Sequence, residues 1–134
     1  MQAVEILLVE DNTGDAMLIR QALYEFPVPV NLHIARDGEQ ALLMLTNPAF
    51  DLDLIILDLN IPKITGAALL ERWRIGETPV VVFSSTENPT EKERSLALGA
   101  REFVSKPTEL QEFSDAVCGI VEKWAMPEGT VIGI

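Results

Sequence analysis

The sequence feature that most constrains the fold is a short apolar run at residues 54–57, which stops at Asp58. The run reads Leu-Ile-Ile-Leu without alternation, and the turn residues Asn60 and Pro62 follow it. An unbroken apolar run of this length is typical of a strand covered on both faces of a parallel sheet. In open α/β sheets the chemistry lies just outside the carboxyl ends of such strands. Asp58 is therefore the first candidate functional residue.

Apolar runs and segments of helical periodicity alternate along the rest of the chain. We expect strands at 4–9, 30–35, 54–57, 80–83 and 101–105, and helices at 38–45, 66–74, 90–98 and 110–124. A further helix, capped by Thr13 or Asp15, should lie between the first two strands. Five β–α units in this order predict an α/β fold with right-handed crossovers and a parallel sheet. The 134 residues suit one domain, expected at 1–125, with a C-terminal tail at 126–134.

Composition and charge exclude several classes of protein. A formal net charge of -11 argues against direct binding to nucleic acid or to an anionic membrane. Cys118 is the only cysteine, so an intramolecular disulfide is impossible and a reducing compartment is favoured. No run approaches the roughly 18 apolar residues of a membrane span, and the N-terminus does not read as a signal peptide. These features predict a cytoplasmic protein.

Groups that could serve a phosphate or a metal follow four of the five expected strands. They are Glu10 with Asp11, then Asp58, Ser84 and Lys106. A parallel sheet gathers its strand ends at one edge, and carboxylates with a carbonyl oxygen suit Mg²⁺. An aspartate can act as the nucleophile that forms an aspartyl phosphate. Lys106 would then balance the phosphoryl charge and the Ser84 hydroxyl would hydrogen-bond one of its oxygens.

Several motifs together resemble a response-regulator receiver domain over about residues 4–124. They are LVEDN at 8–12, LDLNIP at 57–62 with Gly66, PVVVFS at 79–84, LGA at 98–100 and KP at 106–107. The resemblance implies a flavodoxin-like fold, with a doubly wound sheet of five parallel strands in the order 2-1-3-4-5 and five helices. A narrower resemblance, from EDN-x-GD at 10–15 and from the last helix, is to single-domain receivers that serve phytochrome-type histidine kinases.

The family resemblance also implies a role for each residue at the strand ends. Asp58 would be the phospho-acceptor, and Mg²⁺ would contact Asp11, Asp58 and the backbone carbonyl of Asn60. Glu10 would reach the metal through a water molecule. The protein would not be an enzyme but a regulator of a two-component phosphorelay. It would receive its phosphoryl group from a histidine kinase or a phosphotransfer protein and would signal through a changed protein–protein surface.

Other residues would carry the signal away from the phosphorylation site. Ser84 and Lys106 stand where the family has its hydroxyl and its lysine, and Phe103 falls at the aromatic switch position. Ordinary core packing is the alternative for Phe103. The resemblance also allows a cis peptide bond between Lys106 and Pro107, which costs little at proline.

Two other functions are compatible with parts of this pattern. A phosphatase of the haloacid dehalogenase type uses an Asp nucleophile but needs a second carboxylate two residues later, where this chain has Asn60. A scaffold that works without phosphorylation would not need to retain Asp11, Asp58, Ser84 and Lys106.

The last helix and the tail predict a homodimer. The helix is expected to bury Leu110, Phe113, Val117 and Val121 in the core. Apolar residues then continue beyond it: Trp124, Met126, Val131, Ile132 and Ile134. A homodimer that buries this tail, with or without exchange of the tail between two chains, would cover them.

Overall fold

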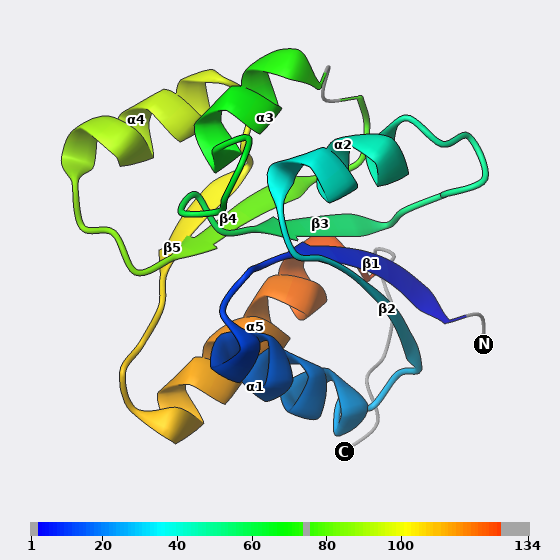
Figure 1. Cartoon of the computed structure of the whole chain (residues 1–134). Coiled ribbons are helices and arrows are strands. Elements are labelled where there is room, and N and C mark those ends of the chain that lie inside the picture. The colour runs from blue at the N-terminus through cyan, green and yellow to red at the C-terminus, as the bar shows by residue number, and fades with distance from the viewer. Residues whose placement is uncertain (1–2, 74–75, 127–134) are drawn as a thin grey trace.

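The computed structural model describes residues 3–73 and 76–126, in which five strands and five helices alternate (Figure 1). The strands are β1 (Val4–Val9), β2 (Val30–Ala35), β3 (Leu54–Leu57), β4 (Val80–Ser84) and β5 (Glu102–Ser105). The helices are α1 (Thr13–Tyr24), α2 (Gly38–Leu45), α3 (Gly66–Arg72), α4 (Pro89–Ala97) and α5 (Leu110–Trp124). No helix of the described ranges is long and apolar enough to cross a lipid bilayer.

The strands form one parallel sheet in the order β2-β1-β3-β4-β5. Helices α1 and α5 lie side by side on one face, whereas α2, α3 and α4 cover the other (Figure 1). This arrangement confirms the predicted flavodoxin-like fold and its strand order. The strands all run in one direction, so their carboxyl ends meet at one edge of the sheet.

The central strands send alternate side chains into two separate cores. In β3, Leu54 and Ile56 pack on the side of α1 and α5, whereas Ile55 and Leu57 pack beneath the other three helices. All four side chains are buried, and each contributes about 1.5–3 kcal/mol to stability. Both faces of the strand are therefore apolar, which explains why the sequence shows no alternation here.

The start of α1 differs from the prediction that Thr13 or Asp15 caps it. Asn12 is the cap, because its backbone is extended and its side-chain oxygen accepts a hydrogen bond from the Asp15 backbone N–H at 2.8 Å. The Asp15 carboxylate is thereby free to make a different contact, which is described below.

Five other element boundaries move by one or two residues. Two of them are the end of α4, at Ala97 instead of residue 98, and the end of β4, at Ser84 instead of residue 83. Helix α3 ends at Arg72 because Trp73 is already extended, whereas the expected end, at residue 74, lies outside the described residues. Helix α4 begins at Pro89, whose missing N–H is tolerated in a first turn. Strand β5 begins at Glu102, one residue later than expected.

Two predictions about the carboxyl-terminal region are wrong. The Leu110 side chain is 63% exposed, because it occupies the first position of α5 and the buried stripe starts only at Phe113. The Lys106–Pro107 peptide is trans, like every other bond in the described ranges, and trans is the isomer favoured by about 0.5–1 kcal/mol. The predicted core residues Phe113, Val117 and Val121 are buried.

Candidate functional site

Four side chains from different strand ends meet at the carboxyl edge of the sheet. The Lys106 ammonium donates hydrogen bonds to Glu10 Oε1 at 2.6 Å and to Asp58 Oδ2 at 2.8 Å. The Ser84 hydroxyl donates to the other Asp58 oxygen, Oδ1, at 3.1 Å. The structure therefore brings together Glu10, Asp58, Ser84 and Lys106, which the sequence places up to 96 residues apart.

Asp58 occupies the centre of the site because its surroundings fix it from several sides. Its Oδ1 atom also accepts a hydrogen bond from the Asn60 backbone N–H at 3.0 Å. A Cβ atom at Gly66 would stand 2.9 Å from the Asp58 carbonyl oxygen and 2.6 Å from Leu59 Cα. Only glycine lets α3 begin this close to the end of β3.

Burial and mutual charge set the protonation of the site. Burial raises the pKa of Glu10 to about 7; the neighbouring Asp58 adds to this rise and Lys106 opposes it. Burial also acts to raise the pKa of Asp58, but hydrogen bonds from Lys106 and from the Asn60 N–H outweigh it, so that this pKa lies below its usual value. The pKa of Lys106 is raised, because its carboxylate partners outweigh burial. Asp58 is thus the ionised carboxylate of the site.

Glu10, Asp11 and Asp58 form an acidic cluster that could hold a metal ion. Each offers a carboxylate oxygen, and these atoms lie within 4.8 Å of one another. Octahedral Mg²⁺ binds oxygens at about 2.1 Å, so neighbouring ligands stand about 3 Å apart and opposite ligands about 4.2 Å apart. The three carboxylates suit Mg²⁺ as hard oxygen donors, and they would draw closer together when the ion binds. Asp11 is exposed whereas Glu10 and Asp58 are buried, so the ion would enter from the side of Asp11.

Asp15 belongs to this site although the sequence analysis considered it only as a helix cap. Its Oδ2 atom accepts a third hydrogen bond from the Lys106 ammonium, at 2.8 Å. The available signal was the spacing, because a residue in the first turn of a helix that follows β1 returns to the same sheet edge.

Arg36 is a second residue that the sequence analysis missed. It directly follows β2, the strand for which no site residue was expected, and it donates hydrogen bonds to the Asp11 carbonyl at 2.9 Å and to Thr13 Oγ1 at 2.8 Å. Arg36 thereby ties the loop that carries Asp11 to the neighbouring strand.

Phe103 lies on β5 directly beside β4, where it pairs with Val82, two residues before Ser84. Its side chain is partly buried. It borders a cavity of about 410 Å³, together with Thr86, Pro89 and Ser105. The ring therefore has space on the side of the β4–α4 loop.

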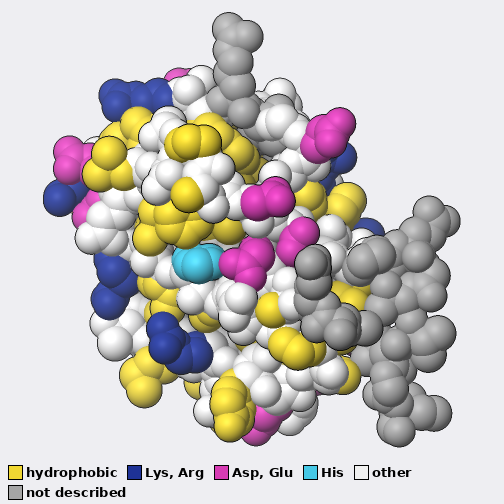
Figure 2. All heavy atoms as spheres, turned by 90° about the vertical axis from the view of Figure 1, so that its right-hand side faces the viewer, with side chains coloured by type: hydrophobic (Ala, Val, Ile, Leu, Met, Phe, Trp, Pro, Cys, Tyr) yellow, Lys and Arg dark blue, Asp and Glu magenta, His cyan; other side chains and the backbone are white. Residues whose placement is uncertain are grey.

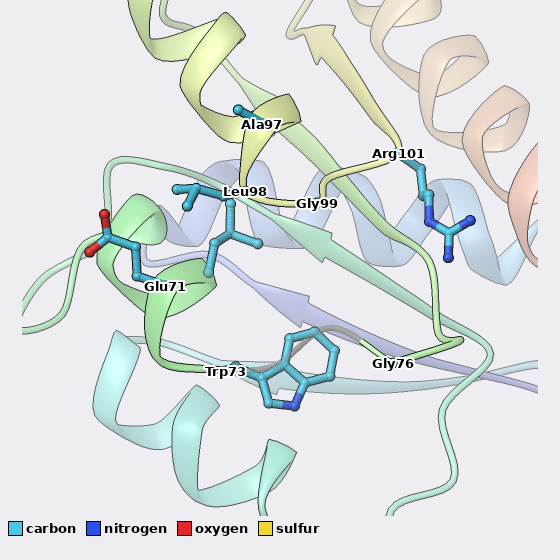
Figure 3. Close-up of a pocket in the computed structure, with 8 residues that line it drawn as sticks. Glu71, Trp73, Gly76, Ala97, Leu98, Gly99 and Arg101 are labelled. Carbon is cyan, nitrogen blue, oxygen red and sulfur yellow. The ribbon is translucent and has the colours of Figure 1, made fainter.

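Other notable surfaces lie away from the strand-end site. Figure 3 shows a pocket at the opposite sheet edge, where Trp73 and Arg101 lie near the ends of α3 and α4.

His33 is the only histidine of the chain, and it lies beside an acidic side chain in Figure 2. Its Nε2 atom lies 3.0 Å from Glu5 Oε1, and its ring packs edge-on against the ring of Phe50. These contacts account for His33 as a structural residue on β2.

Among solved structures, two response regulators resemble the whole chain. The phosphorylated cyanobacterial phytochrome response regulator RcpA is 32% identical, with a TM-score of 0.87 over 99% of this chain and 100% of its own. The Mn²⁺-bound response regulator Rcp1 is 28% identical, with a TM-score of 0.83 over 98% of this chain and 99% of its own.

Curated relatives match the chain with only part of their own length. The autoinducer 2 sensor kinase/phosphatase LuxQ of Vibrio vulnificus is 31% identical over 85% of this chain and 13% of its own. The cell cycle response regulator CtrA of Brucella ovis is 28% identical over 90% of this chain and 51% of its own. The chain thus spans about half of CtrA and a small part of LuxQ.

The sequence of this chain matches the family model of the response regulator receiver domain over residues 6–118, which include every residue of the site described above. The sheet order and the acidic cluster agree with that match. The chain belongs to the response-regulator receiver-domain family.

Proposed function

We propose that this protein is a phospho-accepting response regulator and not an enzyme acting on a separate substrate. It takes a phosphoryl group from a phosphohistidine, on a histidine kinase or a phosphotransfer protein, onto Asp58. The observation that carries this proposal is the environment of Asp58. Its carboxylate is buried yet ionised, and it contacts both the Ser84 hydroxyl and the Lys106 ammonium.

In the transfer, one Asp58 carboxylate oxygen attacks phosphorus while the bond from phosphorus to the donor imidazole nitrogen breaks. Lys106 stands 2.8 Å from Asp58 Oδ2, where its charge would stabilise the incoming phosphoryl oxygens. The Ser84 hydroxyl and the Asn60 N–H hold the other oxygen, Oδ1, and so orient the nucleophile. Mg²⁺ held by Glu10, Asp11 and Asp58 would supply charge neutralisation.

The signal would leave the site through Ser84 and Phe103. Once Asp58 is phosphorylated, the Ser84 hydroxyl gains new acceptors on the phosphoryl group and leaves Asp58 Oδ1. This movement favours a rotated Phe103 ring, for which the adjoining cavity of about 410 Å³ gives room. The changed surface around β4 and β5 would then bind a partner protein more tightly than the unphosphorylated surface does. A two-state switch needs such a difference in contacts between its two states.

The similarity to the phytochrome response regulator RcpA supports a phytochrome-type histidine kinase as the donor. A single cysteine, Cys118, supports a reducing, cytoplasmic location.

A homodimer through α5 and the tail is a further part of the proposal. Trp124 and Met126 pack against the core, and the Trp124 indole N–H donates to Glu102 at 2.7 Å. The dimer therefore depends on Val131, Ile132 and Ile134, which lie outside the described residues. Light scattering should give a dimer mass for the full chain and a monomer mass for a chain that ends at Trp124. A monomeric full chain would contradict this part.

The experiment that tests the function uses purified protein, a small phosphodonor and Mg²⁺, with intact mass as the measurement. The wild-type mass should rise by a single phosphoryl group, and the rise should be absent in Asp58→Asn and in the presence of a chelator. A phosphatase would instead release phosphate continuously, and a scaffold would show no change in mass.

A further inference from the structure

We propose that Asp15 is a positioning residue that holds the Lys106 ammonium when a divalent cation enters the acidic cluster. This inference rests on the proposed function, because it concerns how the site is prepared for the phosphoryl group. Asp15 lies outside the acidic cluster of Glu10, Asp11 and Asp58, and its role would be to keep Lys106 from competing with the cation for that cluster.

In the structure the hydrogen-bonding capacity of the Lys106 ammonium is fully used. Lys106 Nζ donates to Glu10 at 2.6 Å, to Asp15 at 2.8 Å and to Asp58 at 2.8 Å. An ammonium group has three N–H donors, so none is left for a phosphoryl oxygen. The lysine must therefore give up at least one carboxylate before it can serve the reaction.

Two of the three carboxylates are also those that a cation needs. Glu10 and Asp58 belong to the acidic cluster with Asp11, whereas Asp15 does not. A divalent cation and the ammonium consequently compete for oxygens of Glu10 and Asp58. Asp15 is the partner that Lys106 can keep while the cation occupies the other two.

The position of Asp15 suits this role. Its backbone is fixed by the Asn12 cap, and its side chain is 30% exposed, against 1% for Glu10 and 8% for Asp58. Asp15 therefore loses less hydration as an ion than the two buried carboxylates do. Asp15 and Lys106 also line a cavity of about 340 Å³ with Pro107 and Phe113. The ammonium has room to move toward Asp15 and away from the cluster.

The consequence is measurable as cation affinity. Without the Asp15 carboxylate, Lys106 has only Glu10 and Asp58 as charged partners and competes with Mg²⁺ for both. Titration calorimetry with Mg²⁺ on the unphosphorylated full chain should show that Asp15→Asn weakens binding about five- to tenfold. Glu112→Gln is the matched control, because it removes one charge from the first turn of α5 and Glu112 is not a partner of Lys106. It should change the affinity by less than about twofold.

A double-mutant cycle separates positioning from simple charge. In a Lys106→Met background there is no ammonium to hold, so Asp15→Asn should change Mg²⁺ affinity by less than about twofold. An equal weakening with and without the lysine would overturn the proposal.

A second measurement keeps the lysine in place, in case the Lys106→Met variant does not fold. Nitrogen-15 NMR of the lysine ammonium groups in saturating Mg²⁺ should show a protected Lys106 signal in wild type and its loss in Asp15→Asn. A protected signal in both proteins would also contradict the proposal. Both experiments use unphosphorylated protein, so their outcome does not depend on whether Asp58 accepts a phosphoryl group.

Discussion

Replacing Glu10 by Gln should stabilise the metal-free protein at alkaline pH. Glu10 is buried beside Asp58, and burial raises its pKa from 4.5 to about 7. Between these two values the folded protein binds the proton more tightly than the unfolded chain does. The free energy of unfolding therefore falls as the pH rises through this window. Above about pH 7 Glu10 is ionised in the folded protein, and it then lowers the free energy of unfolding by the amount that corresponds to the whole pKa shift.

The size of the effect follows from the two pKa values. A shift from 4.5 to about 7, at about 1.36 kcal/mol per pH unit, corresponds to about 3 kcal/mol. Gln keeps the shape of Glu10 and replaces its neutral, protonated form; the pKa of about 7 already includes the hydrogen bond that Lys106 donates to the ionised form. We therefore expect Glu10→Gln to unfold with a free energy about 3 kcal/mol higher than wild type at about pH 8. The gain should disappear near about pH 5, where Glu10 is protonated in the folded wild type.

The assay is urea unfolding followed by circular dichroism, with a chelator present, at both pH values. Glu93→Gln is the matched control, because Glu93 is exposed on α4 and its replacement changes the net charge by the same amount. This control should shift stability by less than about 0.5 kcal/mol. In excess Mg²⁺ the gain of Glu10→Gln should shrink or reverse, since the cation stabilises the wild-type cluster. A Glu10→Gln protein no more stable than wild type at the higher pH would refute the reasoning.

Two further predictions concern residues around Asp58. Ser84→Ala should still be phosphorylated but should lose most of the change in amide hydrogen exchange around Phe103 that a phosphate mimic causes; an unchanged response would remove Ser84 from the coupling. Arg36→Ala should weaken Mg²⁺ binding about three- to tenfold in titration calorimetry, because the Asp11 carbonyl loses its donor. The same substitution should cost less than about 1 kcal/mol of stability, since Arg36 is exposed, and an unchanged Mg²⁺ affinity would contradict its positioning role.

The fold was predictable because its signals are local. Runs such as 54–57 and 80–83 are apolar on both faces, and a parallel sheet is the arrangement that covers both. The site residues Asp58 and Ser84 were predictable for the same reason, since each follows directly from the end of such a run. Lys106 follows the partly buried edge strand β5, so its signal was its place at a strand end in the β–α order. Strand direction alone then brings them to one edge.

The features that the sequence did not predict are contacts between side chains of different helices, strands and loops, and the exposure of a residue at a helix end. Asp15 and Arg36 join the site through contacts to Lys106 and to the Asp11 loop. Spacing places Asp15 at the sheet edge, but no local pattern shows which partner either side chain contacts. Leu110 fits the helical stripe of α5 by spacing, yet it is exposed because the helix begins there and little of the core lies beneath its first position.

The most direct test of the account is to locate the phosphoryl group chemically. After treatment with a small phosphodonor and Mg²⁺, borohydride reduces an aspartyl phosphate to homoserine, and peptide mass spectrometry then identifies the altered residue. The account predicts homoserine at Asp58 and no reduced side chain at the neighbouring carboxylates Glu10, Asp11 and Asp15. Reduction at one of those three positions, or a labelled protein with Asp58 intact, would contradict it.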